Sequence, residues 1–187
     1  MARSVVDCCN GALQRIGEGR ILALSDNTKA ARECSVAYEG ARRAEIRKYR
    51  WNFAVTRIQL APDATAPAFG FTYQYPLPAD CLRILMPSEA TLDWVLEGGK
   101  ILTKDGPVLN LRYLADITDP TLWDAAFYDL MTVAIALSIV EAITNSPSKK
   151  NLLDRDYKDM LNAARAVNAF EQIAGEPIEC SFVRARF

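Results

Sequence analysis

The segment LMTVAIALSIV, residues 130–140, is the most apolar stretch of the chain, and Asp129 and Glu141 bound it. It is too short to cross a bilayer, which requires about 20 consecutive apolar residues. A helix that is apolar on every side is typical of a protein core. We therefore expect residues 130–140 to form the centre of a buried helix and other helices to cover it.

Polar caps on either side give the limits of this helix and predict another after it. Asp119-Pro120 is an N-cap followed by proline at the first helical position, and the helix extends to about Thr144. Ser146-Pro147 repeats the arrangement for a final helix that reaches about Ala174, before Gly175-Glu176-Pro177 ends it. The apolar stripe of this final helix consists of Leu153, Tyr157, Met160, Leu161, Ala164 and Val167.

Two further helices are predicted near the N-terminus. Ser4 caps the first, and Gly17 follows it at the position where glycine ends a helix. The apolar face of this helix consists of Val5, Cys9, Ala12, Leu13 and Ile16. The second helix begins after Ser25-Asp26-Asn27 and runs to about Arg50. Its apolar face is made of small residues that allow close packing: Ala30, Cys34, Ala37, Ala41 and Ala44.

The opposite face of the second helix is basic. It carries the arginines Arg32, Arg42, Arg43, Arg47 and Arg50. Such a row of charges is typical of a solvated face in an isolated subunit. In an oligomer the same face is available for subunit contacts, and Arg42, Arg43 and Arg47 are the candidates for that interface.

Residues 54–114 have the pattern of β-structure. Five prolines interrupt helical periodicity there: Pro62, Pro67, Pro76, Pro78 and Pro87. Short strands are expected at 55–60, 71–75, 82–86, 92–96, 101–103 and 109–113. Gly98-Gly99 predicts a tight hairpin, and the alternation at Leu109, Leu111 and Tyr113 predicts one buried strand face. Trp51 and Phe53 stand where helix gives way to strand, and we expect them to anchor that junction.

The predicted fold is therefore α+β and mainly α. Residues 1–53 and 115–175 form a four-helix bundle, and residues 54–114 form a β-rich insert between the second and third helices. Residues 176–187 form an extended C-terminal tail. This tail is rich in apolar residues for a disordered segment, so we expect another surface to cover it.

The composition excludes several classes of chemistry. The chain of 187 residues contains no histidine, which removes histidine-based acid–base catalysis and mixed Cys/His metal sites. The odd count of five cysteines argues against a secreted disulfide framework. Ser146 and Lys149 match an S-x-x-K pattern, but helix capping accounts for the serine. We assign no catalytic residue, no metal ligand and no cofactor. Paired carboxylates distant in sequence remain an open alternative.

Four ordered groups of residues resemble one family of phage proteins. They are Asn10–Leu13 with Ile16–Glu18 and Ile21–Leu24; Tyr49–Ala54; Tyr73–Arg83; and Trp123–Phe127 leading to Ile143–Ser146. Their order and spacing are similar to those of the tail tubular protein A family and related prophage structural proteins. The resemblance spans nearly the whole chain, and residues 86–114 match least.

The resemblance implies a structural role in the virion. Members of this family are head–tail adaptors that form a ring, generally dodecameric, beneath the portal protein. The ring joins the capsid to the tail proteins below and continues the DNA channel. The expected partners are therefore copies of the same chain, the portal, a tail protein and non-specifically contacted DNA, without a membrane. The expected location is the neck of the virion, after assembly in the bacterial cytoplasm.

The tail is the predicted attachment to the portal. Phe182, Val183, Arg184, Arg186 and Phe187 follow the last helix, and aromatic residues and arginine are enriched at interface hot spots. The net charge of −1 gives no global attraction to DNA, so we expect weak, salt-sensitive and sequence-independent contact at most. Two alternatives remain open, a helical interaction module of a non-viral cytoplasmic complex and a histidine-free enzyme that uses carboxylates.

Overall fold

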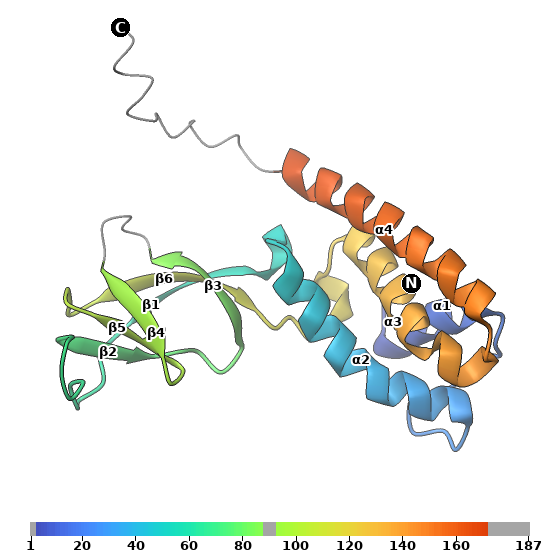
Figure 1. The fold of residues 1–187 in the computed structure, drawn as a ribbon, viewed down its shortest axis with the longest axis horizontal. Helices are drawn as coiled ribbons and strands as arrows, with labels where there is room; N and C mark the ends of the chain where they lie inside the picture. Colours follow the sequence, from blue (N-terminus) through green and yellow to red (C-terminus); the bar gives the residue numbers. More distant parts are fainter. Residues whose placement is uncertain (1–2, 88–92, 172–187) are drawn as a thin grey trace, which may run out of the picture.

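The computed structural model describes residues 3–87 and 93–171 of the chain. Within these residues the fold is mixed α+β, with helices gathered at one side and two antiparallel sheets at the other (Figure 1). The described α-helices are α1 (Val5–Ile16), α2 (Lys29–Lys48), α3 (Ala125–Thr144) and α4 (Pro147–Phe170). The α+β class predicted from the sequence is confirmed.

Helix α3 is the centre of the helical part. Helices α1, α2 and α4 all pack against it, and α1 has little contact with α2. By length and composition α3 is the one helix of the described residues that could cross a membrane. Its apolar surface faces other helices here, since most of its central side chains are buried. The prediction of a buried helix over residues 130–140 is confirmed.

The ends of α1 follow the sequence signals. The Ser4 hydroxyl accepts a hydrogen bond from the Asp7 backbone N–H at 3.0 Å, and the Asp7 carboxylate accepts one from the Ser4 N–H at 3.1 Å. Gly17 ends the helix in the left-handed conformation, with φ of 77°. Both predicted caps of the first helix are therefore confirmed.

Helix α2 differs from the prediction at its cap and on its apolar face. Thr28 is the N-cap, because Asp26 is used in the preceding loop, where its carboxylate accepts hydrogen bonds from the Leu22 and Ala23 backbones. The predicted small face is buried or half-buried at four positions, but Ala44 is exposed. Ile46 occupies the core at this end of the helix, so the prediction for Ala44 is wrong.

The predicted start of α3 is wrong, and the predicted start of α4 is confirmed. Asp119 caps only the short 3₁₀ turn Pro120–Leu122, and Trp123 is extended, so α3 begins after the N-cap Asp124. Ser146 caps α4 as predicted. The predicted apolar stripe of α4 is buried or half-buried except at its C-terminal end, where Val167 is exposed and Asn168 is buried instead. The predicted residues beyond 171 lie outside the described part.

The strands form two three-stranded antiparallel sheets. The first has the order β1 (Val55–Leu60), β6 (Leu109–Ala115) and β3 (Cys81–Pro87). The second has the order β2 (Tyr73–Pro76), β5 (Lys100–Thr103) and β4 (Trp94–Glu97). Gly98 and Gly99 both have positive φ and form the predicted hairpin between β4 and β5. All six predicted strands are present in the described residues, with small differences at their ends.

Two hydrophobic clusters share strand β6. The larger one fills the helical part and includes Leu114 of β6, together with Leu82 of β3. The smaller one contains Leu109, Leu111 and Tyr113 of β6 and side chains of the second sheet. The predicted alternation in this strand is confirmed, and it places β6 between the two cores.

Candidate functional site

The passage from α2 to β1 is built around Trp51. The indole is buried, and its Nε1–H donates a hydrogen bond to the Glu45 backbone carbonyl at 2.9 Å. Its ring lies edge-on to Tyr49 at 5.2 Å and to Phe127 of α3 at 5.0 Å between centroids. Aromatic pairs in this arrangement add stability beyond the area that they bury. The start of the β region is thus packed directly against the central helix.

Further rings extend this packing to the second crossing of the chain, where β6 returns to the helices. Phe53 lies 4.8 Å from the Phe127 ring, and Phe127 lies 5.4 Å from Trp123. The Trp123 Nε1–H donates to the Ile117 carbonyl at 2.9 Å. Trp51 and Phe53 were predicted as the junction, whereas Phe127 and Trp123 were missed. Their spacing of four residues at the start of a helix was the available signal.

A buried ion pair joins α2 to the same return segment. The Arg42 guanidinium donates two hydrogen bonds to Asp116, Nε to Oδ1 at 2.9 Å and Nη2 to Oδ2 at 3.0 Å. The two side chains are only 5% and 11% exposed. Burial lowers the pKa of Arg42, but the hydrogen bonds and charge of Asp116 raise it more, so the net shift is upward. The expectation that Arg42 lies on a solvated face is therefore wrong.

The other two arginines proposed for a subunit interface are exposed. Arg43 reaches the same Asp116 carboxylate at 3.9 Å, and Arg47 donates to the Leu82 carbonyl of β3. Both side chains therefore contact their own chain, Arg43 at the return segment and Arg47 at β3, while remaining open to solvent. Their role at an interface between subunits stays a prediction.

Polar contacts also hold the end of α4 to the junction. The Asn168 side chain accepts a hydrogen bond from the Asn52 backbone N–H at 2.8 Å and donates to the Arg50 carbonyl at 3.0 Å. Near the middle of α4, the Tyr157 hydroxyl donates to the buried Glu45 carboxylate. Asn168 is buried, and these bonds explain why a polar residue replaces the expected apolar one.

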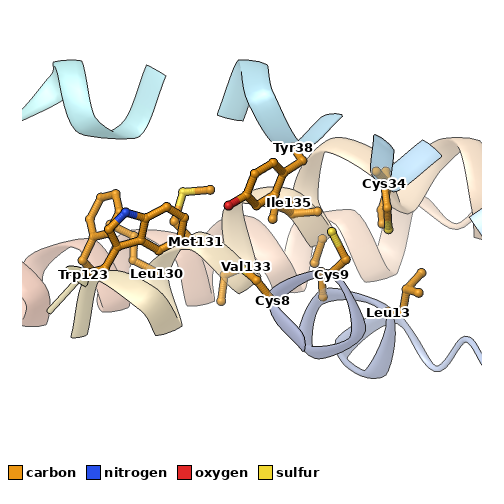
Figure 2. Close-up of a cluster of buried hydrophobic side chains, with 14 of the residues drawn as sticks. Cys8, Cys9, Leu13, Cys34, Tyr38, Trp123, Leu130, Met131, Val133 and Ile135 are labelled. Carbon is orange, nitrogen blue, oxygen red and sulfur yellow. The ribbon is translucent and has the colours of Figure 1, made fainter. Parts of the chain in front are cut away.

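Three of the cysteines lie together in the helical core. Cys8 and Cys9 on α1 and Cys34 on α2 are buried among the apolar side chains shown in Figure 2. Burial raises the pKa of Cys8 to about 12. A hydrogen bond between Cys9 and Cys34 raises the pKa of Cys9 and lowers that of Cys34. Within residues 3–87 and 93–171, no three His, Cys, Asp or Glu side chains are placed to hold a metal ion.

These thiols should be protected in the folded protein. In a Cys180→Ser background, we expect no more than one thiol per chain, that of the half-buried Cys81, to react rapidly with an aromatic disulfide reagent at pH 8. All four should react in denaturant, because the thiolate is the nucleophile and unfolding gives the reagent access to Cys8, Cys9 and Cys34, which are buried in the native protein. Rapid reaction of three or more thiols in the native protein would show that the helical core opens.

The predicted tail residues Phe182, Val183, Arg184, Arg186 and Phe187 lie outside the described residues. Neither a scan against models of protein families nor a search of curated proteins finds a match to this chain.

Proposed function

We propose that this chain is a non-enzymatic structural subunit, a phage head–tail adaptor that forms a ring beneath the portal and continues the DNA channel. In this reading the helices form a bundle from which residues 54–114 project as a β-rich insert. The doubly fixed junction is the observation that supports the proposal. Two crossings of the chain are held by one row of rings and the Arg42–Asp116 pair, and we expect these contacts to make the subunit stiff between its helical and β ends.

Stiffness of this kind suits a connecting ring. A subunit that links two partners must keep its two ends in a constant relation, or the ring would not present a regular surface to either partner. A buried aromatic row and a bidentate ion pair restrict such movement, since side chains in well-packed cores occupy few conformations.

The motif residues that support the family resemblance also have structural roles. The Asn10 carboxamide makes hydrogen bonds to both the N–H and the carbonyl of Ile21, at 2.9 and 3.0 Å. A side chain at Gly11 would meet Thr132 of α3 at 3.0 Å. Trp51 and Trp123 form the junction described above. Each of these positions carries a contact between different segments, as is expected of motif residues that define a fold.

Apolar side chains exposed on the described surface are available for contacts between subunits. Val36 on α2 and Leu22 in the preceding loop are almost fully exposed, and Arg43 lies further along α2. The free energy of the protein falls when a partner covers large apolar side chains and removes them from water. They are the first positions at which ring contacts should be sought.

Imaging the protein with its portal tests the proposal. Light scattering and negative-stain microscopy of the purified chain, alone and mixed with portal, should show a ring that attaches coaxially to the portal. A small oligomer that ignores the portal would favour a helical interaction module and overturn the proposal.

Removal of the C-terminal segment should separate attachment from folding. Deleting residues 181–187 should leave the helical circular dichroism and melting temperature unchanged, because the described core lies upstream. Attachment to the portal should be lost or weakened many-fold, since repeated weak contacts around a ring act together. A truncated chain that binds portal with unchanged affinity would contradict the attachment role, and one that unfolds would place the segment in the subunit core. Double substitution of Phe182 and Phe187 by alanine is the milder companion variant.

A further inference from the structure

Two arginines face each other on the solvent side of the first sheet. Arg57 of β1 is the register partner of Arg112 of β6, and the next pair along the same face is Gln59 with Asn110. Directly opposed residues of antiparallel strands project to the same side, about 5 Å apart at their Cβ atoms. Arg57, Gln59 and Asn110 are exposed and Arg112 is half-buried. The face therefore presents two guanidinium groups beside two carboxamides.

No described carboxylate neutralises this pair. Neither arginine takes part in any ion pair among residues 3–87 and 93–171. The Arg112 Nε is buried and has no hydrogen-bond partner among the described residues. Like charges directly opposite each other destabilise a strand pair, and an unpaired desolvated donor adds a further cost. A bound anion would reduce both costs.

The position of the pair is fixed relative to the helices. The next register pair on the same face toward the helical part is Val55 with Leu114; Leu114 is in the helical core, and Val55 packs against it. The arginine pair thus lies two residues along each strand from that core, and β6 cannot slip without moving Leu114 out of it.

We propose that Arg57 and Arg112, assisted by Gln59 and Asn110, form a contact site for the phosphate backbone of duplex DNA. Arginine, glutamine and asparagine side chains commonly donate to phosphate oxygens, and such contacts carry no sequence information. The two β1–β6 register pairs consist of arginine and carboxamide residues alone, and on its other side Arg112 is the register partner of Met86 of β3. The inference rests on the proposed function, in which DNA passes along the subunit.

The site should bind DNA weakly. Each neutralised phosphate contributes about −0.9 to the slope of log K against log salt, so contact with two phosphates gives about −1.8 per subunit. A site of this size agrees with the near-neutral net charge of the chain. It would let DNA slide, because no base is recognised and each contact is easily exchanged.

Fluorescence anisotropy with a random-sequence duplex tests the site in the full-length chain without portal. Between low and physiological salt, the wild-type slope per bound subunit should be about −1.8, and Arg57→Gln or Arg112→Gln should each reduce it to about −0.9. The double variant should lose measurable binding. The control is Arg155→Gln, which changes the net charge by the same amount. Arg155 is exposed in the N-terminal half of α4, and this half of the helix lies away from the sheets (Figure 1).

Each outcome decides the proposal. Equal loss of binding in the Arg155 variant would assign the effect to net charge and overturn the site. Binding of polyglutamate, but not DNA, with the same arginine dependence would identify an acidic protein partner and overturn the DNA assignment. Should the half-buried Arg112 variant unfold, the exposed Arg57 variant alone decides. Portal attachment is measured separately, so a failed adaptor role and a failed DNA site give different results.

Discussion

Replacing Trp51 with alanine should lower the free energy of unfolding by about 3–5 kcal/mol, the usual cost of removing a large buried aromatic side chain. The indole is buried, packs against Tyr49, Phe53 and Phe127, and donates a hydrogen bond to a backbone carbonyl. For a chain of this size each kcal/mol shifts the melting temperature by about 2–4 °C. Calorimetry should therefore record a decrease of about 6–20 °C.

An exposed aromatic residue, Phe69, provides a matched control for the buried Trp51. Phe69 lies in the loop between β1 and β2 and is 88% exposed, so Phe69→Ala removes an aromatic ring with almost no loss of packing. Its melting temperature should stay close to that of the wild type. If the Trp51 and Phe69 variants melted together, Trp51 would not anchor the junction.

Breaking the buried ion pair should be comparably damaging. Arg42→Met leaves the Asp116 carboxylate in a site that is 11% exposed, and an uncompensated buried charge costs about 3–5 kcal/mol. Arg43 approaches the same carboxylate at 3.9 Å, but it is 60% exposed and compensates little. We expect a result near the lower end of the range, measured as a decrease in the urea midpoint with an unchanged denaturant slope.

The double variant Arg42→Met with Asp116→Leu shows how much of the lost stability comes from the unpaired buried charge of Asp116. Replacing both charges by apolar groups removes the desolvation cost, so stability should recover most of what the single variant loses. Arg155→Met, at an exposed position of α4, is the control for the loss of one arginine. An Arg42→Met variant as stable as this control would show that the pair contributes nothing to the junction.

Local signals predicted the parts of the fold that local contacts determine. Each of these signals acts on the few residues next to it, and the structure contains all of them: the caps Ser4 and Gly17 of α1, the cap Ser146 with Pro147 of α4, and the Gly98-Gly99 hairpin. The start of α3 was predicted too early because two Asp caps follow each other, and only the burial of Trp123 decides between them. Packing at a distance overrides propensity in such cases.

The candidate site depended on long-range pairing and was predicted only in part. Trp51 and Phe53 were visible as aromatic residues at a change of pattern, but their partner Phe127 lies in another helix. Arg42 was placed on a solvated face because its partner Asp116 is 74 residues away in sequence. The Arg57 and Arg112 pair likewise requires the strand register, which alternation within one strand does not supply.

Strand β6 has a consequence for how the protein tolerates change over evolutionary time. Its odd-numbered residues from Leu109 to Tyr113 pack against the second sheet, and Leu114 packs among the helices. A strand covered on one side accepts variation at every second position. Here Leu111 and Tyr113 pack in the smaller hydrophobic cluster and Leu114 packs in the larger one. A one-residue insertion would turn these side chains to the opposite faces of the sheet. Lineages that remodel the loops of the β region should therefore keep the length of this strand.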